Sequence, residues 1–251
     1  MRRLIRTGVA FAAVAALGFL APRARAEDAP KKENTAVKPA AKQGWWMGRH
    51  KAFLDIVKKG GVDVLFLGDS ITDDWGGEGH SPRARGGKVF EKEFVPLKAA
   101  NFGIGGDRTE NVLWRLLNGE LDGIKPKVVM LMIGTNNIGA NSDAEIAAGI
   151  RAVVAEIRKR SPKTKVLLLG IFPRGEKPDT GVRKKIQAIN EMVSKLDDGG
   201  KTVKYLDIGA KFLKEDGTLT KEIMYDFLHL TPEGYRIWAD AVKGPIKQLL
   251  K

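Results

Sequence analysis

Short unbroken apolar runs alternate with amphipathic helical patterns along most of this chain, and this alternation limits its possible folds. The runs at residues 62–67, 127–133 and 166–171 lack the every-second-residue polarity of a half-exposed strand, so they are typical of strands buried on both faces. Between and after them, apolar residues recur at helical spacing over 146–157 and 182–196. Strands that alternate with such helices predict an α/β fold with a parallel sheet covered on both faces.

The rest of the chain supplies the remaining elements. Helices are expected at 45–59, from about 107 to 117 and from Thr231 toward Leu250, and short strands are expected at 203–206 and ending at Asn101-Phe102. Asp107 and Glu110 are typical of a capping pair at the start of the middle helix. Gly244-Pro245 predicts a kink or a restart in the last helix.

The first residues have the pattern of an export signal. A basic start leads into an apolar run over 9–20 and then Ala24-Arg25-Ala26, which predicts a signal peptide over 1–26 cut after Ala26. The protein would then be secreted or periplasmic, without an integral membrane segment; an uncleaved anchor is the alternative. Residues 27–43, rich in Ala, Lys, Pro and Glu, predict a disordered linker before a single domain over 44–251.

Charge and composition argue against several functions. The formal net charge of +13 falls to +8 when the five arginines of residues 1–26 are removed. That excess suits approach to anionic envelope polymers or lipid, and no Lys/Arg run with interleaved aromatics predicts nucleic-acid binding. The absence of cysteine excludes disulfides and thiol chemistry. The scattered acids lack metal-ligand spacing and Gly103–Gly106 lacks dinucleotide-loop spacing, so neither a metal nor a cofactor is expected.

Ser70 is the first candidate for a reacting group. It follows Gly68-Asp69 at the end of an apolar run, and α/β enzymes place reacting groups at the carboxyl ends of parallel strands. Serine is also a common helix N-cap, so this stretch alone leaves a nucleophile and a capping residue equally open. Three more polar or glycine-rich clusters would converge on the same sheet edge: Gly103–Asp107, Gly134–Asn137 and Asp226–His229.

His229 is the candidate base. Asp226 lies three positions before it, so the carboxylate can accept from one ring nitrogen while the other faces Ser70. Such a pair alone is more often structural, but together with the serine turn it favours acyl transfer. The other two histidines are interpreted as surface residues, His50 among the charges of an early helix and His80 in a glycine-rich loop.

Asn136 and Gly106 are the candidate donors to an oxyanion. The Asn136 amide stands at a predicted strand end, although Thr-Asn-Asn is also favourable turn chemistry. Gly106 offers an unobstructed backbone N–H at the start of a predicted helix. Acyl transfer needs such donors beside its nucleophile and base, and the chain has a candidate for each role.

Four short blocks, in this order, resemble those of the SGNH (GDSL-type) hydrolase family. The blocks are Gly68-Asp69-Ser70, Asn101–Gly106, Gly134-Thr135-Asn136 and Asp226–His229. Within that family, further segments are similar to the catalytic subunits of the intracellular platelet-activating-factor acetylhydrolases: 101–107, 112–116, 118–121, 173–176 and 226–230. The resemblance covers roughly residues 62–250.

The resemblance implies a flavodoxin-like three-layer α/β/α sandwich with a mostly five-stranded parallel sheet. It also implies ester hydrolysis without a metal or other cofactor. By position, the catalytic residues would be Ser70, Asp226 and His229, and the oxyanion hole would be formed by Ser70 N–H, Gly106 N–H and the Asn136 amide. Ile71 and Leu228 would line the acyl pocket, where their bulk would favour a short acyl group such as acetyl.

These observations predict an exported serine esterase that removes short acyl groups, acetyl above all, from sugars or polysaccharides. The signal and the lead helix with Trp45-Trp46 distinguish it from the intracellular relatives, so their phospholipid substrate is not carried over. A lysophospholipase or broad arylesterase is the alternative enzyme. A non-catalytic glycan-binding module using Trp75 and the loop 76–87 is the alternative from another class. The resembled subunits pair, which leaves a homodimer open.

Overall fold

The computed structural model describes residues 33–251, and the predicted signal peptide over 1–26 lies outside this range. Five parallel strands form one sheet in the order β2-β1-β3-β4-β5. The strands are β1 (Val64–Gly68), β2 (Ala99–Gly103), β3 (Val128–Met132), β4 (Lys165–Leu169) and β5 (Val203–Leu206). The predicted α/β class and five-stranded parallel sheet are confirmed.

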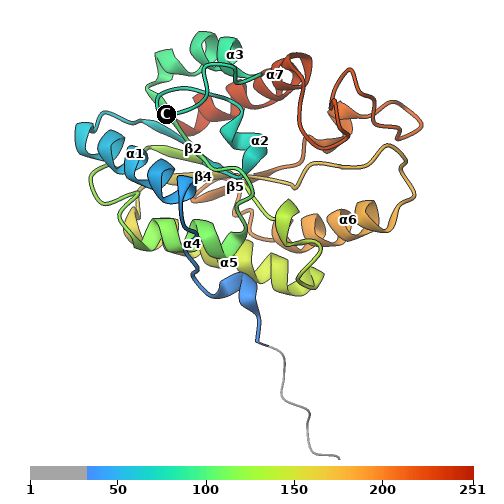
Figure 1. The fold of residues 1–251 in the computed structure, drawn as a ribbon, viewed down its shortest axis with the longest axis horizontal. Helices are drawn as coiled ribbons and strands as arrows, with labels where there is room; N and C mark the ends of the chain where they lie inside the picture. The colour runs from blue at the N-terminus through green and yellow to red at the C-terminus, as the bar shows by residue number, and fades with distance from the viewer. Residues whose placement is uncertain (1–32) are drawn as a thin grey trace, which may run out of the picture. The chain divides into compact units, whose positions relative to one another are not determined.

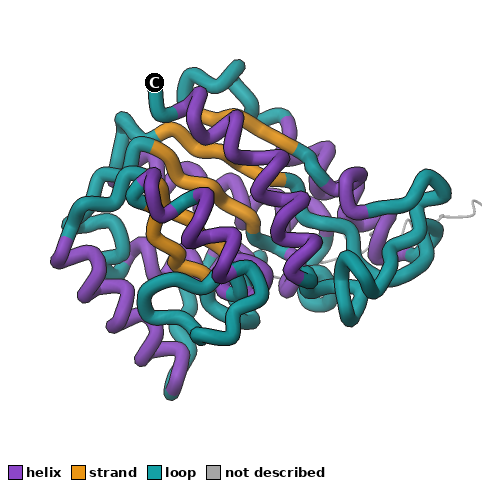
Figure 2. Tube along the Cα trace, turned by 90° about the horizontal axis from the view of Figure 1, so that it is seen from above, coloured by secondary structure: helices purple, strands orange, loops and turns teal. Residues whose placement is uncertain are grey.

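Helices cover both faces of this sheet. One face carries α3 (Gly87–Glu93) and α7 (Pro232–Leu249), and the other carries α1 (Trp45–Lys59), α4 (Thr109–Leu117), α5 (Asp143–Arg160) and α6 (Gly181–Ser194). Figure 1 shows α3 and α7 above the strands and α4 and α5 beneath them, and in Figure 2 helices cross over the strands. Shorter elements are η1 (Thr35–Val37), α2 (Ser70–Asp73), η2 (Val95–Leu97), η3 (Thr135–Asn137) and η4 (Gly209–Phe212). No helix within residues 33–251 has the length and apolar character needed to cross a membrane.

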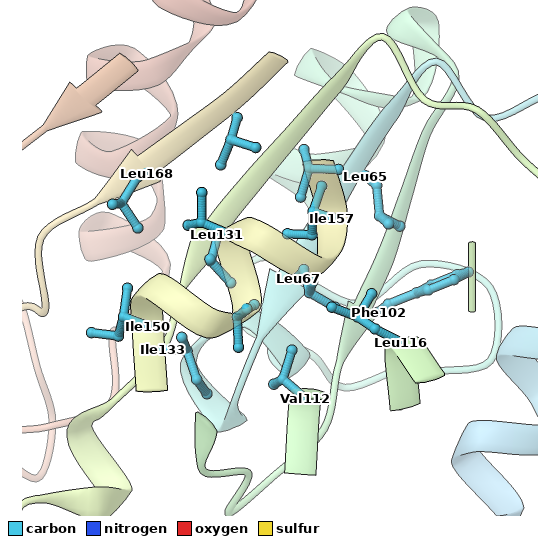
Figure 3. Packing of buried hydrophobic residues seen from close by; sticks show 14 of the residues in the cluster. Leu65, Leu67, Phe102, Val112, Leu116, Leu131, Ile133, Ile150, Ile157 and Leu168 are labelled. Atoms are coloured by element: carbon cyan, nitrogen blue, oxygen red, sulfur yellow. The ribbon is translucent and has the colours of Figure 1, made fainter. Parts of the chain in front are cut away.

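The apolar runs are unbroken because successive side chains of one strand enter two different cores. Leu65 and Leu67 of β1 pack with α1, α4, α5 and α6, whereas Val64 and Phe66 pack with α3 and α7. All four are fully buried. Figure 3 shows the first core, with Leu65, Leu67 and Leu131 among its labelled side chains. A polar side chain at any of these positions would lose its water without gaining a partner, so both faces select apolar residues.

Two helix ends differ from the sequence-based expectations. The Asp107 carboxylate does not cap α4; instead the Arg108 N–H donates to the Asn111 side chain at 3.0 Å. The final helix continues through Pro245, so of the two outcomes predicted at Gly244-Pro245 the restart is excluded and the kink stays a prediction. Its N-terminus is as predicted, with Thr231 as the N-cap and proline in the first turn.

Residues 34–43, which we call the N-terminal strap, are packed against the domain, so the predicted disordered linker is wrong over this stretch. Ala36 in η1 is fully buried, and its carbonyl accepts a hydrogen bond from Thr109 Oγ1 at 2.7 Å. Ala40 N–H donates to the backbone of α4 at 3.1 Å. Backbone hydrogen bonds rather than an apolar stripe hold the strap, and composition does not reveal such bonds.

Candidate active site

Ser70 begins α2 directly after β1 and is held there from three sides. Asp69, not Ser70, is the N-cap, because its Oδ1 accepts the Ile71 N–H at 3.0 Å. A Cβ on Gly103 would lie 2.2 Å from the backbone of α2, so glycine lets the helix approach the strand end closely. The Tyr235 hydroxyl of α7 donates to Ile71 O at 2.6 Å. The Ser70 hydroxyl is therefore not used as a helix cap.

His229 and Asp226 reach Ser70 from the loop that precedes α7. Ser70 Oγ lies 3.0 Å from His229 Nε2, and His229 Nδ1 lies 2.7 Å from Asp226 Oδ2. Asp226 Oδ1 also accepts the backbone N–H of His229 at 2.7 Å and of Leu228 at 3.1 Å. Phe227 has a φ of 61°, a left-handed conformation that costs a non-glycine residue about 1 kcal/mol or more. The three side chains expected to meet are thus in hydrogen-bond contact.

Local hydrogen bonds favour the charged form of the Asp226 carboxyl. Its partial burial would raise its pKa, but hydrogen bonds from the backbone and side chain of His229 outweigh burial and lower the pKa below its ordinary value. A carboxylate at Nδ1 keeps the hydrogen on that nitrogen, which leaves Nε2 to accept the Ser70 hydroxyl.

Asn136 and Gly106 come from two other strand ends. Asn136 Nδ2 donates to Asp107 O at 2.8 Å, and its second N–H remains for another acceptor. Gly106 has a φ of 74°, in the left-handed region that favours glycine, and Lys42 Nζ donates to its carbonyl at 2.7 Å. Within residues 33–251, no protein group accepts a hydrogen bond from the N–H of Ser70 or Gly106. These donors are the kind that a developing oxyanion requires.

A buried ion network holds the segment around Asp107. The Arg115 side chain is fully buried, and it donates to Asp107 Oδ2 at 2.9 Å and to Glu120 Oε2 at 2.6 Å. Trp46 Nε1 donates to Asp107 Oδ1 at 2.6 Å, and His50 Nδ1 lies 2.9 Å from Glu120 Oε1. The interpretation of His50 as a surface residue is wrong, because this carboxylate gives its ring a polar partner inside the core.

Reasoning from the sequence also missed a second network, around Asp73. Its Oδ1 lies 2.6 Å from His80 Nδ1 and 2.7 Å from Arg49 Nη2, while its Oδ2 accepts the Gly105 N–H at 3.0 Å. The His80 side chain is fully buried, so its assignment to the surface is wrong as well. The sequence did contain a signal that Arg115 is buried, since it places a charged residue within the apolar stripe of a helix. No comparable pattern in the sequence marks His80 as buried.

Asp69 gives the site a pH-dependent stability. Burial raises the pKa of its carboxyl to about 7, and its Oδ2 has no hydrogen-bond partner among the described residues. An unfolded aspartate titrates near 3.8, so between about pH 4 and pH 7 the folded chain keeps a proton that the unfolded chain has released. The free energy of unfolding therefore falls as the pH rises through this window.

Asp69→Asn is expected to remove this pH dependence, because asparagine still caps a helix but cannot ionise. The melting temperature at pH 8 should rise by on the order of 5 °C relative to the native chain, with little difference at pH 4. Thermal melts from pH 4 to pH 8 measure both curves. Asp55→Asn, at a position whose side chain is 66% exposed, is the control and should follow the native curve. An Asp69→Asn variant that kept the native slope would contradict the assignment.

A cavity of about 640 Å³ adjoins the triad of Ser70, His229 and Asp226 on the side of Asp226, which lines it. Asn136, Asp226 and Leu228 line it, together with apolar surface from Ile138. Ile71, by contrast, is 1% exposed and packs in the core shared with α3 and α7. Of the two residues expected to line the acyl pocket, only Leu228 therefore lies at this cavity. Within the part of the chain that the structure describes, no group of three or more acidic or histidine side chains is arranged to hold a metal ion.

Trp75 does not face this site. It is fully buried and packs against Tyr235 and Trp238, with ring centroids 4.6 Å and 4.9 Å away. The glycan-binding-module hypothesis assigned Trp75 to ligand contact, and burial removes that support. Of the loop that follows, His80 turns inward, whereas Arg85 remains partly exposed beside Asp74.

Comparison with known proteins identifies the family to which this fold and site belong. Residues 66–237 match the GDSL-like Lipase/Acylhydrolase family, and the chain belongs to that family. It is accordingly a carboxylic ester hydrolase. The resemblance inferred from the four short blocks is confirmed.

Curated relatives and solved structures agree with this assignment. The chain is 41% identical to platelet-activating factor acetylhydrolase IB subunit alpha2 of Gallus gallus over 206 residues, 82% of this chain and 85% of that protein. It is 36% identical to the alpha1 subunit of Homo sapiens over 224 residues, 89% and 92% of the two chains. A GDSL-like lipase from Bacteroides thetaiotaomicron superposes with a TM-score of 0.63, at 20% identity and 79% and 97% coverage. A catalytic mutant of Axe2, an acetylxylan esterase from Geobacillus stearothermophilus, superposes with a TM-score of 0.58 at 20% identity, over 74% of this chain and 94% of that one. Both solved structures share the fold of this chain.

Proposed function

We propose that this protein is an exported serine esterase that hydrolyses short-chain esters, principally acetyl esters, on carbohydrates. The observation that carries the proposal is the 3.0 Å contact between Ser70 Oγ and His229 Nε2, with Asp226 Oδ2 2.7 Å from the other ring nitrogen. A hydroxyl, an imidazole and a carboxylate in this series form an activated nucleophile.

The proposed reaction passes through an acyl-enzyme. His229 Nε2 takes the hydroxyl proton as Ser70 Oγ attacks the ester carbonyl carbon, and Asp226 stabilises the imidazolium that forms. The N–H groups of Ser70 and Gly106 and the Asn136 amide would donate to the oxyanion. The C–O bond to the alcohol then breaks and the alcohol leaves with the proton from His229. Water, deprotonated by the same imidazole, releases the acid and restores Ser70.

Three observations support the choice of substrate. Leu228 lies at the cavity, where the bulk of its side chain would favour a short acyl group over the one that a smaller residue would admit. A relative at 41% identity is named an acetylhydrolase, and a protein of the same fold is an acetylxylan esterase. The signal-like pattern of residues 1–26 supports export, where acetylated polysaccharides are accessible.

A lysophospholipase or arylesterase is the second candidate, and one feature favours it. Apolar side chains, Ile138, Val182, Phe227 and Leu228, line part of the cavity of about 640 Å³ beside the triad. Such a lining could accept a longer acyl chain, so the acyl-length preference distinguishes the two enzymes.

Hydrolysis of p-nitrophenyl acetate, butyrate and octanoate by the full chain tests the proposal. We expect kcat/KM to be highest for acetate and at least about tenfold lower for octanoate, because a methylene excluded from a pocket costs on the order of tenfold. Leu228→Ala should shift the preference toward butyrate, whereas Leu117→Ala, on an exposed site at the far end of α4, should not.

Two results would count against this assignment. If octanoate were the fastest substrate, the lysophospholipase or arylesterase hypothesis would be favoured. A fluorophosphonate that labelled a residue other than Ser70, detected as a mass shift on a different peptide, would contradict the proposed nucleophile.

A further inference from the structure

The indole of Trp45 is exposed at the candidate active site and has no partner among residues 33–251. Its exposed fraction of 64% is the largest among the large apolar side chains of this range. Tyr225, the other exposed aromatic residue, stacks with the His229 ring and has the Arg85 guanidinium 4.1 Å from its centroid. The Trp45 ring has no such aromatic, cationic or hydrogen-bonding neighbour within that range.

Gly105 brings Trp45 next to Ser70. A Cβ on Gly105 would lie 3.7 Å from Trp45 Cη2 and 3.9 Å from Ser70 Cβ, so the outer edge of the indole and the serine border the same small space. Asp73 Oδ2 accepts the Gly105 N–H at 3.0 Å and fixes the backbone at the base of that space. A group attached to an ester at Ser70 would therefore lie within reach of the indole.

Anchors on both sides hold the backbone at Trp45. Helix α1 starts at this residue, and the next side chain, Trp46, is buried and donates to Asp107 Oδ1 at 2.6 Å. On the other side Lys42 Nζ donates to Gly106 O at 2.7 Å. A large apolar ring left in water contributes nothing to the core, so an exposed tryptophan held beside a reacting group is typical of a binding surface.

The surroundings of Trp45 fit a sugar ring better than a lipid chain. The residues around the Gly105-Gly106 turn that the indole borders are polar or small, namely Lys42, Asp73 and the glycines themselves. A long acyl chain needs a continuous apolar surface, and these neighbours interrupt one. A pyranose carries C–H groups on its faces and hydroxyls on its rim, so it can pair one aromatic face with nearby donors and acceptors.

We propose that Trp45 forms a stacking subsite for a sugar ring of an acetylated oligosaccharide whose ester lies at Ser70. The inference rests on the proposed esterase function and adds the residue that selects the alcohol side of the ester. Binding energy from this remote part of the substrate would hold the ester carbonyl at the nucleophile.

The test compares two substrates, p-nitrophenyl acetate and acetylated xylo-oligosaccharides, with the full chain and its Trp45→Ala variant. We expect the ratio of kcat/KM for the oligosaccharide to kcat/KM for p-nitrophenyl acetate to fall about tenfold, chiefly through KM, because one aromatic contact is worth about that factor in affinity. Trp45→Phe keeps an aromatic face and should restore most of the ratio. Leu117→Ala, which removes an exposed apolar side chain distant from the triad, should leave the ratio within about twofold of native, since it touches no part of the site.

The outcomes separate this inference from the esterase proposal. A native chain inactive on both esters would overturn the proposed function itself. If the native chain hydrolyses both esters and Trp45→Ala leaves the ratio unchanged, only the subsite is overturned. The subsite is also overturned if the native chain hydrolyses p-nitrophenyl acetate but not the acetylated oligosaccharides. If Trp45→Ala converts a dimer to a monomer in sedimentation while the ratio stays unchanged, Trp45 belongs to a contact between copies and the subsite is likewise overturned.

Discussion

Ser70→Ala is expected to lower kcat for p-nitrophenyl acetate by about 10⁴-fold or more, since removal of a triad nucleophile leaves only the contribution of binding and oxyanion donors. The hydroxyl that is lost is the one 3.0 Å from His229 Nε2. Its removal leaves the imidazole with no proton to accept from a nucleophile. KM should change little, because the methyl group retains the shape of the site. Initial rates of the two purified proteins measure the loss.

A matched serine provides the control for this variant. Ser194 near the end of α6 donates its hydroxyl to Glu191 O of the same helix, and Ser194→Ala should retain native kcat within about twofold. Both variants should melt near the native temperature, which separates a chemical loss from unfolding. More than a tenth of the native rate in Ser70→Ala would be incompatible with the proposed nucleophile.

Arg115→Met is expected to cause the largest loss of stability, about 3–5 kcal/mol in the free energy of unfolding. Methionine matches much of the arginine volume but removes the cation that two buried carboxyls, Asp107 and Glu120, share, and only Asp107 has a second one, Lys42 at 3.5 Å. The Phe102 carbonyl also loses a donor at 3.0 Å. Urea unfolding followed by tryptophan fluorescence measures the change.

Arg236 offers a comparison with the same charges at the surface. It also pairs with two carboxylates, Glu233 and Asp240, but its side chain is 58% exposed. Water solvates all three groups when the pair is broken, so Arg236→Met should cause little measurable change. Equal losses for the two arginine variants would show that burial is not what makes the Arg115 network costly to break.

The central strands β1 and β3 could be predicted because burial on both faces controls every position along them, whereas the edge strand β5 has an exposed Lys204. The run at 203–206 coincides with β5, and the run at 127–133 differs from β3 by one residue at each end. Capping was harder to assign, since Asp69 and Ser70 are adjacent and both are residue types that cap helices. Only the hydrogen bond from Ile71 N–H to Asp69 distinguishes them.

Three of the errors, at His50, His80 and the N-terminal strap, share a physical cause, which is polar contact between segments far apart in the sequence. His50 becomes a core residue because Glu120 lies against it, and the His80 ring is held inward by the Asn101 carbonyl, 2.7 Å from its Nε2 and 21 positions later in the chain. The N-terminal strap is ordered by hydrogen bonds of its own backbone with α4, to the Glu110 carbonyl and from the Thr109 hydroxyl. Hydrophobic periodicity carries no information about such pairs, so composition alone could not distinguish the strap from a linker.

The hydrogen bond from the Tyr235 hydroxyl to Ile71 O links the closing helix to the turn that carries the serine. His229 belongs to that same late stretch, 159 positions after Ser70. A chain that ends before residue 229 would thus lack both the imidazole and the clamp on the serine turn, and one that ends between residues 229 and 235 would lack the clamp. Hydrolytic activity would therefore begin only after residues 229–235 have been added to the chain, and fragments that end before residue 229 would be inert.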